Sequence, residues 1–185
     1  MQNDLNEQEI IERAKHGEVR SFEWVVNKFR RYVFVIAFRI LCNEDEANEV
    51  VHESFIKVWR NFTNYNNSIK FTTWLYKIAV NLCYDKLKSR KRKMTIDITD
   101  DMLANLLQSE QDPENEFSNA QLAEKIKLLS EHLPPKQKII FIMRDLHDLS
   151  INEVATITGM SESSVKTNLV YARRTIKEKL IRWMN

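Results

Sequence analysis

Short polar side chains followed by cations form the most chemically suggestive stretch of the chain, between Ser163 and Lys177. Hydroxyl and amide groups near a helix N-terminus can hydrogen-bond base edges in the major groove of DNA, and Arg and Lys further along can bind phosphates. The candidate residues are Ser163, Ser164, Lys166, Thr167, Asn168, Val170, Tyr171, Arg173 and Arg174. Their chemistry is binding, not bond making. For this stretch alone, an ordinary amphipathic helix with a solvated cationic face is the alternative.

A second group of residues, between Asn61 and Lys93, suits single-stranded nucleic acid. An Asn-rich segment without helical period, expected to be a loop over residues 61–70, precedes a segment with helical period from 71 to about 90. Unpaired bases stack on aromatic rings, while amides and cations contact base edges and backbone. The candidates are Asn61, Asn64, Asn66, Asn67, Trp74, Lys77, Asn81, Asp85 and Lys88. Alternatively, Trp74 and Tyr76 belong to the core and the basic run is a solvated helix end.

The chain shows no pattern typical of a catalytic or metal site. Its four histidines lack metal-ligand spacing, and His52-Glu53 lacks the second His of an HExxH motif. No Gly-rich loop is present to cradle a phosphate. Cys42 and Cys83 lie in apolar helical patterns without CxxC spacing and are expected to be two buried, reduced thiols. We therefore expect no enzyme activity, no metal and no cofactor.

The candidate DNA-reading residues require a helix that presents them, and local signals predict one. Ser150 and Glu153 have the spacing of a capping box, so a short helix should begin after Ser150. Gly159 supplies a sharp turn, and Ser161 should cap a longer helix. A short helix, a Gly turn and a longer basic helix are typical of a DNA-binding helix-turn-helix.

The rest of the chain also reads as helical, because 185 residues contain only two glycines and three prolines. A first helix is predicted from Asn6 to about His16, and a second is predicted with Ser21 as its N-cap. Asn43 precedes three acids, which favours a third helix start at that point. A further helix should follow Asp112-Pro113. The expected fold is all-α.

Charge divides the chain more clearly than composition does. Residues 71–93 contain seven basic residues and one acid, residues 94–124 contain eight acids and no Lys or Arg, and residues 161–185 contain six basic residues and two acids. Two cationic blocks flanking an acidic connector suggest two surfaces for one nucleic acid. The expected organisation is two small helical domains, 1–93 and 112–185, joined by an acidic extended linker, 94–111.

Targeting signals and membrane spans are not expected. Acids occupy the first turns, where a secretory signal would have a basic start and an apolar run. The longest apolar run, Tyr32 to Phe38, is too short to cross a bilayer. A soluble, cytoplasmic protein is expected.

Three stretches together resemble the group 4, or extracytoplasmic-function (ECF), sigma factors of bacterial RNA polymerase. EANEVVHESFIKVWRN, from Glu46 to Asn61, resembles the helix with which that family docks on the polymerase clamp. FTTWLYKIAVNLCYDKLKSRKR, from Phe71 to Arg92, resembles its promoter-melting segment. Ser150 to Leu180 resembles its reader of the −35 element. The three motifs occur in the family's order and cover nearly the whole chain.

The resemblance implies a role for each part. Residues 1–93 would be sigma-70 region 2, which binds core polymerase (beta and beta-prime subunits) and melts the −10 element, and residues 112–185 would be region 4. The polymerase contacts would be Asn48, Glu49, His52, Glu53, Phe55 and Trp59. Promoter elements about 17 base pairs apart lie roughly 58 Å apart, so the linker would be held extended, as an acidic mimic of RNA. An anti-sigma factor, usually membrane-anchored, would regulate the protein.

The chain departs from the family pattern where it reads DNA. Ser163-Ser164 stands where the family often has Gly-Thr, and Asn168 and Tyr171 leave fewer bidentate Arg contacts for guanine. The main alternative is a helix-turn-helix regulator; an enzyme, for which the motifs above are missing, and a helical adaptor fit the residues less well. A two-domain helix-turn-helix regulator would bind duplex DNA on its own, whereas a sigma factor should need core polymerase. A helical adaptor would leave both basic surfaces unexplained.

Overall fold

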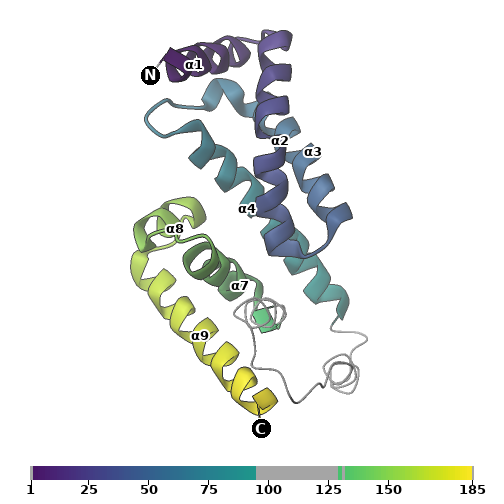
Figure 1. Cartoon of the computed structure of the whole chain (residues 1–185), viewed down its shortest axis with the longest axis vertical. Helices are drawn as coiled ribbons and strands as arrows, with labels where there is room; N and C mark the ends of the chain where they lie inside the picture. The colour runs from purple at the N-terminus through teal and green to yellow at the C-terminus, as the bar shows by residue number, and fades with distance from the viewer. Residues whose placement is uncertain (1, 95–128, 131, 185) are drawn as a thin grey trace.

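The computed structural model describes residues 2–94, 129–130 and 132–184, and every regular element within these ranges is helical. The first half contains α1 (Gln2–Lys15), α2 (Val19–Leu41), α3 (Glu44–Asn61), the short 3-10 helix η1 (Phe62–Asn64) and α4 (Phe71–Met94). α2, α3 and α4 pack on one another, and α1 packs on α2. Figure 1 shows these helices as the purple-to-teal part of the molecule. The expected all-α fold is confirmed.

Helix starts and ends in the first half follow local chemistry, with two corrections. α1 begins at Gln2, four residues before the predicted start at Asn6. The side chain of Asn43 accepts a hydrogen bond from the Glu46 amide at 2.9 Å, so α3 begins where its acids predicted. Ser21 does not cap α2. The helix begins at Val19 after the extended residue Glu18, and the buried Ser21 hydroxyl donates to the Glu18 carboxylate at 3.0 Å. Gly17, at φ 89°, allows the chain to turn early, so that the N-cap lies at Glu18, three residues before the predicted cap.

The second half contains α7 (Pro135–Phe141), the π-helical turn η2 (Ile142–Leu146), α8 (Ile151–Thr158) and α9 (Glu162–Met184). The capping box is complete: the Ser150 hydroxyl accepts from the Glu153 amide at 3.2 Å, and the Glu153 carboxylate accepts from the Ser150 amide at 2.8 Å. Gly159 ends α8 at φ 70°, and the Ser161 hydroxyl accepts from the Ser164 amide at 3.2 Å. The predicted helix-turn-helix is confirmed.

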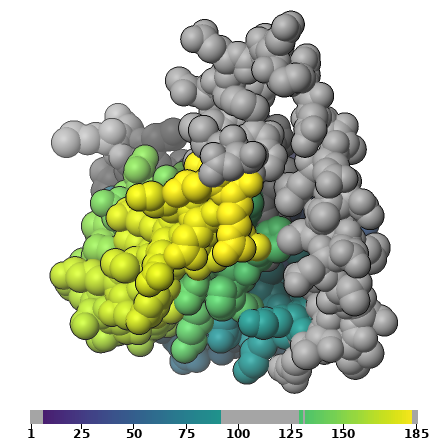
Figure 2. All heavy atoms as spheres, turned by 90° about the horizontal axis from the view of Figure 1, so that it is seen from below, coloured from purple at the N-terminus to yellow at the C-terminus, as the bar shows by residue number. Residues whose placement is uncertain are grey.

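The two halves share one apolar core. α4 packs against both α7 and α8, and the Tyr76 hydroxyl lies 2.7 Å from Nδ1 of His147. Figure 2 shows the green residues of the second half lying directly against teal residues of α4. A cavity of about 350 Å³ between α4 and the second half is lined by Asn81, Tyr84 and Ile139 among others. The halves are therefore in contact.

Several sequence predictions need correction or lie beyond the described residues. α4 continues to Met94, so the basic run that was expected to close it at about Arg90 lies within the helix. Cys83 is buried as expected, whereas Cys42 is only half-buried because α2 ends at Leu41 and Cys42 adopts a left-handed conformation, φ 51°. Beyond Met94, the predicted acidic linker lies outside the described residues, as does the predicted helix start at Asp112. None of the described helices is both long and apolar enough to cross a membrane.

Candidate nucleic-acid and protein interfaces

One exposed face of α3 carries the residues expected to contact a protein partner. Asn48, Glu49, His52 and Glu53 line a shallow hollow together with Asp45. The Glu49 carboxylate pairs with the Lys86 ammonium of α4, and this hydrogen bond lowers the pKa of Glu49. The face is acidic and open to solvent.

An apolar groove lies beside this face, between α2 and α3, and its volume is about 740 Å³. Its exposed rim includes Ile56 and Trp59, and the Trp59 ring contacts that of Phe22 with centroids 4.7 Å apart. Phe55 is only 6% exposed, so it lies in the wall of the groove and does not project from the α3 face. Sequence reasoning missed the groove, although Val19, Phe22 and Val26 share a helical spacing that could have indicated it.

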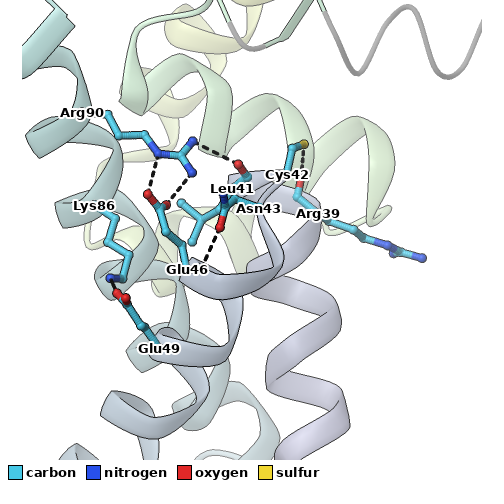
Figure 3. A network of polar contacts seen from close by, with 8 residues as sticks. All are labelled: Arg39, Leu41, Cys42, Asn43, Glu46, Glu49, Lys86 and Arg90. Carbon is cyan, nitrogen blue, oxygen red and sulfur yellow. Dashed lines mark hydrogen bonds and ion pairs between the residues drawn. The ribbon is translucent and has the colours of Figure 1, made fainter.

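The basic end of α4 is tied to the first turn of α3, as Figure 3 shows. The Arg90 guanidinium donates to both carboxylate oxygens of Glu46, with Nε 3.0 Å from Oε1, and to the Leu41 carbonyl oxygen at 3.0 Å. Leu41 is the last residue of α2, so Arg90 joins the ends of three helices. Arg90 and Lys86 therefore have protein partners, whereas Lys77 and Lys88 are exposed and form no ion pair with any described residue.

The Asn-rich loop lies over a cluster of aromatic rings. Phe62, Tyr65, Phe71 and Trp74 contact one another at centroid distances of 5.1–6.3 Å. The Tyr65 hydroxyl donates to the Ile69 carbonyl at 2.8 Å and closes the loop from inside. Because Trp74 is half-buried in this cluster, it supports the loop while keeping part of its surface accessible.

The segment expected to be a loop from residue 61 is helical as far as residue 64, because Asn61 ends α3 and Asn64 ends η1. All four asparagines of this segment are exposed, and three of them have described hydrogen bonds. The Asn61 side chain donates to the Lys57 carbonyl at 2.9 Å, the Asn66 side chain accepts from the Ser68 amide at 2.9 Å, and the Asn67 side chain donates to the Glu12 carboxylate at 3.3 Å. Asn64 is exposed at the end of η1. The amides thus lie on the surface, above a rigid aromatic base.

One face of α4 continues from the loop. Lys77, Asn81, Asp85 and Lys88 follow one another at three- and four-residue spacing and are exposed. Asn81 also lines the cavity between α4 and the second half. The packed halves therefore cover the edge of this face.

The outer face of α9 carries the other predicted contacts. Ser163, Lys166, Thr167, Val170, Tyr171 and Arg174 are exposed, and Ser164 and Asn168 are half-buried. The Asn168 amide donates to the Ser164 carbonyl at 2.8 Å, and the Arg174 guanidinium donates to Glu178 at 2.8 Å. Arg173 donates two hydrogen bonds, of 2.9 and 2.6 Å, to Asp145 of η2. This pair fixes α9 to the turn before α8, a contact that sequence reasoning did not identify.

In the described ranges, no group of three or more His, Cys, Asp or Glu could hold a metal ion. His147 is half-buried, and burial together with Arg39 lowers its pKa to about 4. Burial raises the pKa of Tyr76, its hydrogen-bond partner. The pair is therefore neutral near pH 7 and serves as a contact between the halves.

Comparisons with known proteins agree with the two-part architecture. The family model for Sigma-70 region 2 matches residues 25–93, and that for Sigma-70 region 4 matches residues 116–176. The chain is 26% identical over 178 residues to the ECF RNA polymerase sigma factor SigW of Bacillus subtilis, covering 92% of this chain and 94% of SigW. It is 27% identical over 186 residues to the ECF RNA polymerase sigma-E factor of Haemophilus influenzae, covering 97% and 98% of the two chains.

Solved structures show the same fold. CnrH in complex with the cytosolic domain of CnrY superposes with a TM-score of 0.61 at 17% identity, covering 94% of this chain and 96% of that chain. The sigma factor RpoE of Bartonella quintana, in complex with the anti-sigma factor NepR, superposes with a TM-score of 0.59 at 17% identity, covering 88% and 98%. With both sigma-70 regions in order along one chain, the protein belongs to the sigma-70 family and is a sigma factor of the ECF type.

Proposed function

We propose that this sigma factor divides its work between two units, 1–93 and 112–185, joined by residues 94–111. The first unit binds core polymerase, through its beta and beta-prime subunits, and opens the −10 element. The second unit reads the −35 element with α9. The chain acts by binding and carries out no bond chemistry of its own, and it works in the cytoplasm.

The polymerase contact is assigned to α3 and the adjoining groove. Asn48, Glu49, His52 and Glu53 supply an exposed polar and acidic face, and the groove beside it exposes Trp59 and Ile56. An apolar centre with an acidic rim suits a helical partner surface that carries apolar and basic side chains. Trp59 is the expected anchor, because large aromatic residues in pockets contribute most to such interfaces. Phe55 acts from beneath, by holding the groove wall.

The observation that carries the melting proposal is the loop between η1 and α4. Its amides are exposed, its backbone is closed by the Tyr65–Ile69 hydrogen bond, and stacked rings support it. A pre-formed amide-rich surface can bind the edge of an extruded base that a closed duplex would hide. Lys77, Asn81, Asp85 and Lys88 continue along α4 from the loop, and we assign them to the displaced strand. A reader of closed duplex DNA has no use for this arrangement.

The −35 assignment rests on the exposed face of α9. To base edges we assign Lys166, Thr167, Asn168, Val170 and Tyr171, with Ser163 and Ser164 at the helix start; these residues are exposed except for the half-buried Ser164 and Asn168. Arg174 is highly exposed, and its intrahelical pair with Glu178 exchanges readily for a phosphate. Arg173 is held by Asp145, so its phosphate contact would follow the orientation that this pair imposes.

We assign regulation of this protein to an anti-sigma factor. The family resemblance implies that this partner is anchored in the membrane, so membrane proteins are the first candidates to test for binding. Two of the structural relatives were solved in complexes, CnrH with the cytosolic domain of CnrY and RpoE with the anti-sigma factor NepR. The apolar groove and the acidic α3 face of this chain offer such a partner a surface that overlaps the polymerase contact.

Run-off transcription from a promoter library tests the proposal. Core polymerase should initiate at discrete promoters only when this protein is added, and without ATP hydrolysis before the first bond. Replacing Asn66 and Asn67 together by Ala should reduce initiation on duplex templates, and a pre-melted −10 bubble should restore it. The same bubble should not rescue Lys166→Ala. Specific binding of duplex sites by the protein without polymerase would instead support a conventional helix-turn-helix regulator.

A further inference from the structure

A carboxylate from α1 touches the loop to which base capture is assigned. Oε2 of Glu12 accepts a hydrogen bond from the Asn67 side-chain amide at 3.3 Å, across 55 positions of sequence. In Figure 1 the loop before α4 lies close to α1, and α1 also contacts η1. Glu12 lies before residue 25, where the Sigma-70 region 2 match begins. The contact therefore adds a residue to the loop site from outside the matched segment.

Glu12 is held in place by its own helix. Ile11 and Ala14, on either side of Glu12, are 6% and 1% exposed and belong to the core. Five residues before Glu12, Glu7 pairs with Lys28 of α2 and attaches the helix to the rest of the first half. The other carboxylate oxygen, Oε1, lies 3.4 Å from Lys15 Nζ and 3.4 Å from His16 Nε2. One oxygen thus faces Lys15 and His16 of α1, and the other is left for the loop.

The charge state of Glu12 is fixed by the same contacts. The hydrogen bond from Asn67, followed by the nearby Lys15 and His16, lowers the pKa of Glu12 against the opposing effect of burial. At neutral pH the group is a carboxylate, which can only accept hydrogen bonds.

The Glu12 carboxylate, as a hydrogen-bond acceptor on the α1 side of Asn67, determines which amide atom Asn67 presents on its other side. The amide NH₂ must face Glu12, so the Asn67 carbonyl oxygen is directed away from α1. Rotation of the amide about its terminal side-chain torsion would bring the carbonyl oxygen against the Glu12 carboxylate oxygen, so the hydrogen bond from Asn67 to Glu12 itself opposes the reversal. The exposed side of the loop then combines a hydrogen-bond acceptor with a nearby negative charge.

We propose that Glu12 determines specificity in the −10 loop, because it fixes the Asn67 amide so that the loop favours a captured cytosine or adenine over thymine. Cytosine and adenine carry an amino group on the Watson–Crick edge, which donates to an acceptor. Thymine carries carbonyl oxygens at both ends of that edge, which an acceptor beside a carboxylate repels. The inference rests on the proposed function, since it requires that this loop captures a base.

The test uses the full-length protein with core polymerase on templates that differ only in having C, A or T at each −10 position. Wild type should prefer C or A over T at one position, and Asn67→Ala should abolish that preference. Glu12→Ala should lower the same preference by about three- to tenfold, the range for loss of one hydrogen bond. Glu12→Lys should move the preference toward T, because a donor at this place turns the amide around.

Glu9→Lys is the matched control. Glu9 is on the same helix, is exposed and pairs only with Arg13 among the described residues, at 2.6 Å, so it reproduces the charge change without touching the loop. Its base preference should equal that of wild type. A change of base preference from C or A to T in Glu12→Lys cannot arise from partial unfolding, because partial unfolding would reduce initiation on all templates alike.

The outcomes separate this inference from the proposed function. If Asn67→Ala loses the preference and Glu12→Ala and Glu12→Lys both keep it, the loop captures a base and the inference about Glu12 is wrong. If Glu12→Ala lowers initiation equally on C, A and T templates, Glu12 is a structural residue only, and the inference is again overturned. If wild type supports no initiation on any template, the proposed function fails first.

Discussion

Replacing Arg90 by Ala should destabilise the fold far more than replacing Lys86 by Ala, although both residues pair with carboxylates of α3. The Arg90 and Glu46 side chains are only 29% and 28% exposed, and Arg90 also satisfies the last carbonyl of α2. Hydrogen bonds to charged groups in such settings contribute about 2 kcal/mol to the free energy of unfolding. For a chain of this length, that loss lowers the melting temperature by about 4–8 °C.

The Lys86–Glu49 pair gives the contrast. Glu49 is 61% exposed, and a single exposed ion pair is weakened by water and salt. Lys86→Ala should shift the melting temperature by less than about 2 °C, in the range of solvent-exposed pairs. Thermal unfolding followed by circular dichroism measures both variants under identical buffer conditions.

A double-mutant cycle of Arg90→Ala and Glu46→Ala completes the test. The two losses should be strongly non-additive, because each variant removes the same bonds. Equal shifts for Arg90→Ala and Lys86→Ala, or simple additivity in the cycle, would refute the distinction between a structural staple and an exchangeable surface pair.

Three further outcomes are expected. Glu49→Lys combined with Glu53→Lys should weaken binding to core polymerase in a pull-down at moderate salt while helicity stays unchanged, and unaltered binding would remove the α3 face from the interface. Asn168→Ala should change the preferred base at one −35 position by about 1–3 kcal/mol, whereas Arg174→Ala should weaken all sites alike; identical uniform losses across a site library would contradict these roles. The pKa of His147 is lowered to about 4, so from about pH 6.5 down to 4 the unfolded chain binds a proton that the folded chain does not, and stability falls. His147→Gln should therefore show a flatter dependence of melting temperature on pH, and equal slopes would assign the loss to other groups.

Local signals in the sequence predicted the helix-turn-helix because each depends on only a few neighbouring residues. Ser150, Glu153, Gly159 and Ser161 satisfy or terminate helix ends through bonds that span three or four positions. The cap at Ser21 was predicted by the same rule and is wrong, because Gly17 lets the chain turn early and Glu18 then precedes the helix. At α2 neither the residue type nor the position of the cap followed the rule, because Glu18 makes no side-chain capping bond.

Contacts between distant residues could not be predicted in this way. Glu12 and Asn67, or Arg173 and Asp145, meet only because helices of particular length cross at particular places. The apolar groove beside α3 combines residues from two helices whose individual patterns read as ordinary core faces. The candidate DNA contacts came from side-chain chemistry and the polymerase contacts from the family resemblance, and both stay predictions until the variants are measured.

The packing of α4 on α7 and α8 has a cost for promoter binding by the isolated protein. α9 packs on α8, and packed helices lie about 8–10 Å apart, so α9 lies within about 20 Å of α4 near their shared neighbour. Promoter elements about 17 base pairs, or roughly 58 Å, apart cannot both be reached across that distance. The chain must therefore separate its halves, losing the Tyr76–His147 bond and exposing apolar surface, before it binds both elements.

If closed molecules outnumber open ones by about a hundred to one, the apparent dissociation constant for promoter DNA rises about a hundredfold, which is about 2.7 kcal/mol of binding free energy. Polymerase that binds the open form supplies the free energy of separating the halves, and it does so equally for every promoter. A ligand that binds in the cavity beside Asn81 and Tyr84 would instead change the fraction of molecules in the closed form.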